Sequence, residues 1–421
     1  MNAVFFLSAI IMMLIWKING ILGNTMSNHP PLNQQFTYIG QSPTIAVSDR
    51  MLALKAAGRT VISLTAGDPD FSTPDGIIAA GMRAMQSGLT HYGPSRGFPH
   101  LRTAIAAKLA APYDPESEVL VTHGGVHAYY TALQSILNPG DAVMIPDPSW
   151  GTHANMVRLL RGEVIPVPAL PEDGFLPKLQ TWNSVLTPQT RALVINYPAN
   201  PTGAVPPRDY LKALLEFADQ HDLWVISDEV YENLYFGEKP VSAASFPEHR
   251  SHVMLVNSLS KTYAMTGWRI GYLAAPGAVI ENALKASQNS ITCVAPFIQE
   301  AAAFALTDEA MQAQAAAMRA GYARRRDLVM RIYSEYPDSA VVVTPPQGAF
   351  YFFLDLRALN LTADDICEQL LDQAGVGLVP GTAFGPHGRG FARMTIAASD
   401  EDVDKGFRAI LDWAKVKVEG A

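Results

Sequence analysis

The chain has 421 residues, enough for two domains, and its 48% hydrophobic and 17% charged residues exclude a disordered protein. A net charge of −8 at pH 7 provides no basic surface for nucleic acid, so we expect no nucleic-acid partner. Two cysteines are too few for a disulfide framework or a zinc site, which favours a cytoplasmic protein without a metal centre.

Residues 4–16 form an apolar run interrupted only by Ser8. The run is shorter than the roughly 20 residues that span a bilayer. It also lacks a preceding basic residue and a clear signal-peptidase site. A membrane anchor, an interfacial helix and an upstream extension are the alternatives. We favour the extension, so residues 1–26 are expected to lie outside the fold and no membrane partner is expected.

The next elements lead to a first loop of interest. A helix is predicted for residues 46–58, a short strand for 61–65 and a helix from Pro74 to about residue 87. The turn-rich segment AGDPDF at 66–71 separates the last two. Tyr92 then begins a loop rich in glycine and proline. Its phenol could donate a hydrogen bond to a phosphate, although half-buried packing is the ordinary role of such a ring.

Two strands are then each followed by residues suited to a flat, phosphorylated ligand. The strand 119–121 runs into THGGVH and a helix predicted for 128–137, an order that suits anion binding by backbone N–H groups. A plain strand–helix turn would look the same. The strand 142–145 is followed by Trp150, which could stack on a ring or pack in the core.

A third strand, 192–196, ends in YPANPTG, where the Asn200–Pro201 bond is a candidate cis peptide. After a helix at 210–221, the strand 223–227 ends at Asp228. An acid there lies where α/β sheets bind ligands, and a buried carboxylate needs a cationic partner to stay ionised. The protonated ring nitrogen of a pyridine is such a partner.

The strand 253–256 leads into NSLSKTYAMTGWRIGY, which contains Lys261. A lysine among small hydroxyl residues suits a Schiff base, because the amine needs room and must lose its proton to attack a carbonyl. Ser258 and Arg269 suit a phosphate held beside it. For an isolated motif of this kind, a surface lysine would be the simpler interpretation.

The rest of the chain predicts the fold class. Strands alternating with helices up to residue 273 indicate a mostly parallel sheet. A long helix at 308–336 precedes strands at 340–343, 350–354 and 391–396 and helices at 363–373 and 400–416. We therefore expect an α/β protein: a large domain with helices on both sides of the sheet, plus a smaller α+β domain. The expected divisions are 27–75 (N-terminal arm and part of the small domain), 76–310 (large domain) and 311–421 (small domain).

NPTG at 200–203, SDEVY at 227–231 and SLSKTYAMTGWRIG at 258–271 resemble, in this order and spacing, the class I/II aminotransferases of pyridoxal-phosphate fold type I. The resemblance extends from about residue 35 to the C-terminus. It implies a pyridoxal 5′-phosphate (PLP) enzyme that moves an amino group from an L-amino acid to a 2-oxo acid by a ping-pong mechanism. It also implies a homodimer with shared active sites. The segments GDPDF and TGWR are most similar to those of aspartate, aromatic and arginine–pyruvate aminotransferases.

The resemblance also implies roles for single residues. Lys261 would form the Schiff base with the cofactor and then move the substrate proton, and Asp228 would pair with the pyridine nitrogen. Tyr231 and Asn200 would bind the ring oxygen O3′. The remaining roles fall to the phosphate (Gly124, Gly125, Val126, Ser258, Arg269 and, from the neighbouring subunit, Tyr92), the ring face (Trp150) and the substrate carboxylate (Gly67, Asn200, Arg393).

Two departures from the family pattern concern phosphate and substrate. Val126 stands where some relatives have a hydroxyl residue, so one phosphate hydrogen bond is missing. Residues 285–297 contain no arginine for a second substrate carboxylate. A PLP lyase or an aminocyclopropane-carboxylate-synthase-like enzyme is the alternative on the same fold. A transcription regulator would need a DNA-binding domain ahead of the matched region.

Overall fold

The computed structural model describes residues 32–40 and 43–419, and the chain divides into two units, 1–40 and 41–421. The described part of the first unit holds the 3-10 helix Gln34–Tyr38, capped by Asn33, whose side chain accepts a hydrogen bond from the Gln35 amide. The apolar run at 4–16 lies outside the described residues. Within the described ranges, no helix is long and apolar enough to cross a membrane.

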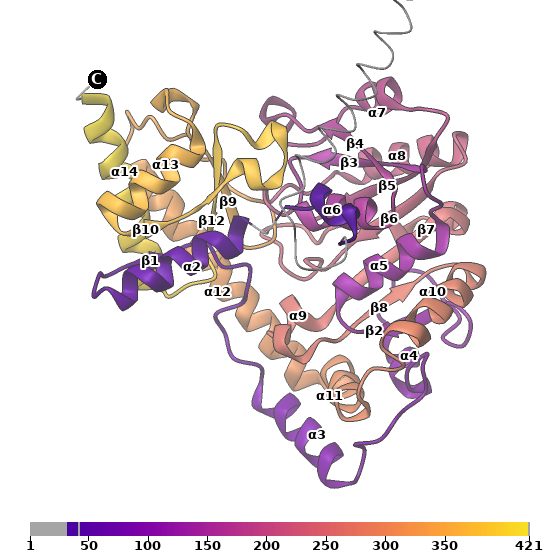
Figure 1. The fold of residues 1–421 in the computed structure, drawn as a ribbon. Coiled ribbons are helices and arrows are strands. Elements are labelled where there is room, and N and C mark those ends of the chain that lie inside the picture. The colour runs from indigo at the N-terminus through magenta and orange to yellow at the C-terminus, as the bar shows by residue number, and fades with distance from the viewer. Residues whose placement is uncertain (1–31, 41–42, 420–421) are drawn as a thin grey trace, which may run out of the picture. The chain divides into compact units, whose positions relative to one another are not determined.

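The second unit is built on a seven-stranded sheet in the order β2-β8-β7-β6-β5-β3-β4 (Figure 1). Only β8 runs antiparallel to its neighbours, so the prediction of a mostly parallel sheet is confirmed. The strands are β2 (Val119–Thr122), β3 (Ala142–Asp147), β4 (Glu163–Pro168), β5 (Thr190–Asn196), β6 (Trp224–Asp228), β7 (Val253–Ser258) and β8 (Gly271–Ala274).

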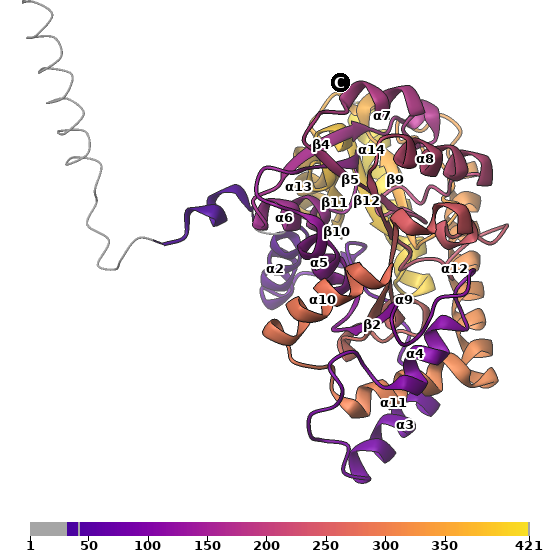
Figure 2. The same cartoon turned by 90° about the vertical axis from the view of Figure 1, so that its right-hand side faces the viewer.

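Helices cover both faces of this sheet because its central strands are apolar on both sides. On β6, Val225 belongs to one hydrophobic cluster and the adjacent Ile226 to another. Helices α5 (Gly125–Ile136) and α10 (Gly277–Ser290) pack on the Ile226 face, and α8 (Arg208–Gln220) on the opposite face (Figure 2). The other helices of this part are α3 (Asp75–Gln86), α4 (Pro99–Ala106), α6 (Gly151–Leu159), α7 (Leu179–Val185), α9 (Leu259–Thr262) and α11 (Pro296–Thr307).

Helix α12 (Glu309–Ser334) leads from α11 to a second, smaller group of strands. There β11 (Val379–Pro380), β12 (Phe391–Thr395) and β9 (Tyr351–Asp355) form an antiparallel sheet with α13 (Ala363–Gln369) and α14 (Asp400–Glu419) beside it (Figure 1). The early strand β1 (Ile62–Ser63) pairs with β10 (Val376–Gly377), and Arg50 of α2 (Pro43–Ala56) forms an ion pair with Asp372. The expected fold class is confirmed, including the contribution of the N-terminal segment. The expected domain boundaries stay a prediction.

Three sequence-based elements were wrong in detail. Residues 340–343 do not form a strand, because only Val342 pairs, through an isolated bridge with Asp355. The helix expected at 363–373 ends as α13 at Gln369 and continues as a π-helical turn. Helix α5 begins at Gly125, three residues before the expected start. The last difference matters for function, because it places the glycine pair Gly124–Gly125 at the start of a helix, as its N-cap and its first residue.

Candidate active site

The carboxyl ends of the parallel strands border a cavity of about 500 Å³. This is where open α/β sheets place their ligands. The cavity is lined by most of the residues singled out in the sequence: Gly67, Gly125, Val126, Trp150, Asn200, Asp228, Tyr231, Ser258, Lys261, Arg269 and Arg393. Gly124 and Tyr92 are the exceptions. Gly124 immediately precedes the lining residues of α5, whereas the Tyr92 side chain is 86% exposed.

Lys261 is placed by α9, the single helical turn that follows β7. Its Nζ donates a hydrogen bond to the carbonyl of Gly67, a residue 194 positions earlier in the chain. Burial lowers the pKa of Lys261 to about 8. The nearby charge of Asp68 raises this pKa, and the charges of Arg393 and Arg269 lower it. The cavity therefore contains an amine that is partly neutral near pH 7.5, as nucleophilic attack on a carbonyl requires.

One wall of the cavity is built to receive an anion. Gly125 and Val126 form the first turn of α5, whose free N–H groups and positive helix end favour negative charge. Gly124 has φ +81°, and a Cβ there would lie 2.8 Å from Arg269 Nη2. The guanidinium of Arg269 thus lies directly against the glycine turn, and its Nη1 donates to the Thr266 carbonyl at 2.8 Å. The hydroxyl of Ser258 adds a further polar group.

A second glycine, Gly271, allows this wall to form. It opens β8, where it pairs with Thr122 at the end of β2 and with Ser258 at the end of β7. A Cβ at Gly271 would lie 2.6 Å from the Asn257 carbonyl oxygen and 2.7 Å from the carbonyl carbon of Gly124. Three backbone segments therefore meet at van der Waals contact. This packing brings Ser258 and Arg269 to the start of α5.

Asp228 ends β6 and is buried, with 4% of its surface exposed. Its Oδ1 accepts from the Val230 amide at 3.2 Å, and its Oδ2 lies 3.0 Å from His153 Nε2. His153 is fully buried on α6, and Trp150, which begins that helix, contacts the imidazole edge-on at 5.2 Å. Sequence reasoning missed His153. The available signal was its position one helical turn after Trp150, on the same face of α6.

Opposite Asp228, residues of the smaller sheet complete the cavity. The hydroxyls of Tyr231 and Tyr351 are 2.8 Å apart, and Tyr351 of β9 was also missed. Arg393 on the adjacent strand β12 lies over the Tyr351 ring at 4.4 Å. Its Nη1 donates to Asn200 Oδ1 at 3.0 Å and its Nη2 to the Thr65 carbonyl at 2.7 Å. The Nε of Arg393 is buried without a hydrogen-bond partner, which leaves a donor for a ligand.

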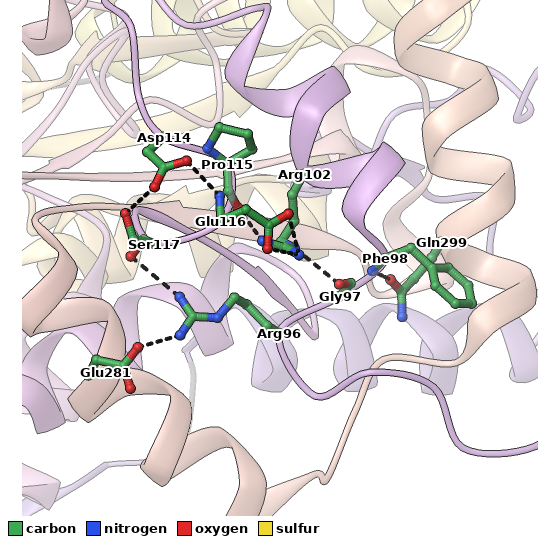
Figure 3. A network of polar contacts seen from close by, with 10 residues as sticks. All are labelled: Arg96, Gly97, Phe98, Arg102, Asp114, Pro115, Glu116, Ser117, Glu281 and Gln299. Carbon is green, nitrogen blue, oxygen red and sulfur yellow. Dashed lines mark hydrogen bonds and ion pairs between the residues drawn. The ribbon is translucent and has the colours of Figure 1, made fainter.

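The loop that carries Tyr92 has a firmly held base (Figure 3). Phe98 N donates to Gln299 Oε1 at 2.7 Å, and the buried Arg102 donates to the Gly97 carbonyl at 3.1 Å. Arg96 forms an ion pair with Glu281. The Arg96 carbonyl accepts a hydrogen bond from the Val121 amide at 3.0 Å, which joins the loop to β2, the strand that precedes Gly124 and Gly125. Tyr92 is thus a large aromatic side chain presented outward from a fixed base.

Comparison with known proteins decides the family. Residues 59–410 match the family model described as aminotransferase class I and II. The chain belongs to this family.

The aminotransferase is also similar to proteins with different substrates in their names. It is 40% identical over 379 residues (89% of this chain, 97% of the relative) to a probable aspartate/prephenate aminotransferase of Thermus aquaticus. It is 37% identical over 365 residues (86% and 92%) to an arginine–pyruvate transaminase of Pseudomonas aeruginosa. A solved aspartate aminotransferase from Thermus thermophilus with maleate superposes with a TM-score of 0.87 at 37% identity, covering 92% of this chain and all of that one.

Proposed function

We propose that the aminotransferase uses pyridoxal 5′-phosphate, held through Lys261, to move amino groups between L-amino acids and 2-oxo acids. The observation that carries the proposal is an amine with a pKa of about 8, placed in one cavity between an anion-binding helix end and a buried carboxylate. When bound, the cofactor supplies a ring that accepts the electron pair released at the substrate α-carbon.

The residues around the cavity match the three polar parts of this cofactor. The N-cap Gly124, the first residues of α5 (Gly125 and Val126), Ser258 and Arg269 would hold the phosphate. Asp228 would hold the proton on the pyridine nitrogen, and the His153 contact at 3.0 Å would fix its carboxylate. Tyr231 and Asn200 would donate to the ring oxygen, and Trp150 would cover the ring face.

Lys261 would serve the reaction twice. Its Nζ would hold the cofactor and, once free, would take the proton from the substrate α-carbon and carry it through the 1,3-shift that transamination requires. The Gly67 carbonyl orients this amine, and burial keeps part of it neutral. The same groups then act in reverse on a 2-oxo acid, which gives a ping-pong sequence of two half-reactions.

Arg393 is proposed to bind the substrate α-carboxylate, with Gly67 and Asn200 closing the pocket around it. The guanidinium is 3% exposed and keeps one buried donor without a partner. A carboxylate would satisfy that donor and neutralise a buried charge, which is costly to leave alone. Every substrate should therefore carry an α-carboxylate.

The pocket for the substrate side chain lacks a free cation among the described lining residues. Among the described residues that line the cavity, the basic side chains are Lys261, Arg269 and Arg393, and each has the role proposed above. Val126 contributes an apolar surface, and residues 285–297 contain no arginine. We therefore propose that aspartate and glutamate are not strongly preferred over neutral and aromatic amino acids. The relatives' names include aspartate, prephenate, aromatic amino acids and arginine, so side chains of different charge are used among similar proteins.

Tyr92 supports a homodimer in which each subunit completes the other's site. Tyr92 does not line the cavity of its own chain and is 86% exposed, and the residues that follow it, from Arg96 to Arg102, are held by hydrogen bonds and an ion pair. A phenol presented in this way could donate to a phosphate in a second subunit. A cytoplasmic location stays a prediction.

Half-transamination tests the proposed function. An amino acid added alone to the purified holoenzyme should convert the yellow cofactor into pyridoxamine phosphate and release one equivalent of 2-oxo acid. Borohydride should attach the cofactor covalently to Lys261, and Lys261→Ala should lose nearly all turnover. Release of ammonia or a cyclic product without pyridoxamine phosphate would show a lyase or synthase instead.

A further inference from the structure

A second cavity, of about 280 Å³, lies behind the active-site turn α9, and three cationic side chains line it. They are Lys108, just after α4, Lys239, in the loop after Glu232, and Arg319, on α12. A neighbouring hollow of about 230 Å³ shares Lys108, Lys239 and Glu232 and adds one further cation, Arg208, and one further acid, Glu229. Positive charge from four separate chain segments therefore gathers in one place, on a protein whose net charge is −8.

These cations form no ion pairs with neighbouring acids in the described part of the chain. Among the described residues, no ion pair involves Lys108, Lys239 or Arg319, and Arg319 lies over the Tyr235 ring at 4.2 Å. The one acid lining the larger cavity, Glu232, accepts a hydrogen bond from Asn257 Nδ2 at 2.8 Å. Burial raises the pKa of Glu232, while the Asn257 hydrogen bond and the charge of Lys239 lower it. The lining is therefore positive overall.

A short chain of contacts joins this cavity to the active site. Asn257 donates to Glu232 on the cavity side, and its Oδ1 accepts from the Ser258 amide at 2.7 Å on the other. Ser258 lines both cavities. The Ser258 hydroxyl in turn accepts from the Ser260 amide at 3.0 Å, which holds the first turn around Lys261. Two hydrogen bonds therefore connect Glu232, through Asn257, to Ser258, which belongs to the proposed phosphate site.

We propose that this rear cavity binds a phosphate dianion, free or carried on a small metabolite, and that its binding loosens the hold on the cofactor. A tetrahedral dianion presents several acceptor oxygens and can meet cations arriving from different directions, whereas a planar carboxylate carries one charge and two oxygens. The anion's charge would offset the charge of Lys239, which favours the ionised form of Glu232. Glu232 would then hold a proton more readily and accept a weaker hydrogen bond from Asn257.

The binding part of this proposal is tested by calorimetric titration of the cofactor-loaded enzyme, in which the active-site phosphate position is filled. Inorganic phosphate and glycerol 3-phosphate form separate arms, which distinguish a free ion from a phosphate ester. We expect Lys239→Met and Arg319→Met to weaken binding about tenfold or more, because each removes a charge-assisted contact. Lys212→Met is the matched control, since Lys212 is an exposed lysine on α8 that pairs with Glu216.

Sodium chloride at matched ionic strength separates a site from general screening. The proposed site does not exist if chloride gives the same binding heat as phosphate. It is also excluded if Lys239→Met and Arg319→Met bind phosphate as tightly as Lys212→Met. This readout does not depend on transamination, so it stands apart from the proposed function.

The coupling part is tested by the first-order rate of cofactor loss into a trapping protein. Competition for the cofactor's own phosphate position cannot change this rate constant, because the trap prevents rebinding. Phosphate should raise it in the wild type and leave it unchanged in Lys239→Met. A rate constant independent of phosphate in the wild type would overturn the coupling.

Discussion

The depressed pKa of Lys261 can be tested directly in the cofactor-free protein. With a pKa of about 8, about a quarter of the Lys261 amines are neutral at pH 7.5, against about 0.1% for a lysine at the ordinary 10.5. The neutral fraction of Lys261 is thus roughly two hundred times that of an ordinary lysine at this pH. Because only the neutral amine is acylated, the rate of acylation should rise by about the same factor.

Asp68→Asn should lower this pKa further, because the charge of Asp68 favours the ammonium form. If the loss is about one pKa unit, the neutral fraction at pH 7.5 rises to about three quarters, an increase of about threefold. At pH 9.5 both proteins are almost fully neutral at this site, so the variant and the wild type should then react equally. The effect is thus confined to a defined pH range.

Competitive labelling with a limiting acylating reagent, quantified by mass spectrometry of the Lys261 peptide between pH 6 and 11, provides the measurement. Lys285, an exposed lysine on α10, is the reference within the same digest. Asp75→Asn is the matched control, since Asp75 is exposed and does not contribute to the pKa of Lys261. Titration of Lys261 above pH 10 would refute the reasoning, as would a higher pKa in Asp68→Asn.

Three further outcomes are expected. His153→Phe should keep the cofactor but lose about 10- to 100-fold in single-turnover rate, because Asp228 loses a hydrogen bond worth about 1.5–3 kcal/mol; an unchanged rate would exclude this role. Arg393→Lys should raise KM for all amino donors alike, since the point charge of an ammonium cannot replace the two parallel N–H donors that a guanidinium offers a carboxylate. An increase in KM limited to one donor would contradict the proposal that Arg393 binds the α-carboxylate. Tyr92→Phe should weaken cofactor binding without dissociating the dimer, as measured by equilibrium dialysis and sedimentation; a fully active monomer would remove the basis for this expectation.

Much of the site could be predicted because its residues follow strand ends. Asp228, Ser258 and the glycine pair stand directly after apolar strands, and parallel strands bring their carboxyl ends to one edge of the sheet. One short segment then contains both the apolar residues that predict a strand and the polar residues that predict a site at its end. The anion wall and the position of Lys261 could therefore be read from short segments.

The residues that sequence reasoning missed have no such local signal. Tyr351 reaches Tyr231 across 120 positions, from a strand that reads only as an aromatic part of the small sheet. His153 is an ordinary helix residue until the fold brings it against Asp228. Residues 340–343 have the composition of a strand, but tertiary pairing supports only Val342. Each case depends on contacts between distant segments, which pattern and propensity do not encode.

The meeting of Gly271 with Asn257 and Gly124 has a consequence for how this sequence can vary. Gly271 does not line the cavity, yet any side chain at this position would collide with the backbone of Asn257 on β7 and of Gly124 and Gly125 at the start of α5. A variant library restricted to cavity-lining positions would omit Gly271, and in a library that randomised Gly271 nearly every variant would have disrupted backbone packing at this position. Divergence or engineering of substrate choice is therefore expected at lining positions that already carry a side chain, such as Val126 on the same wall.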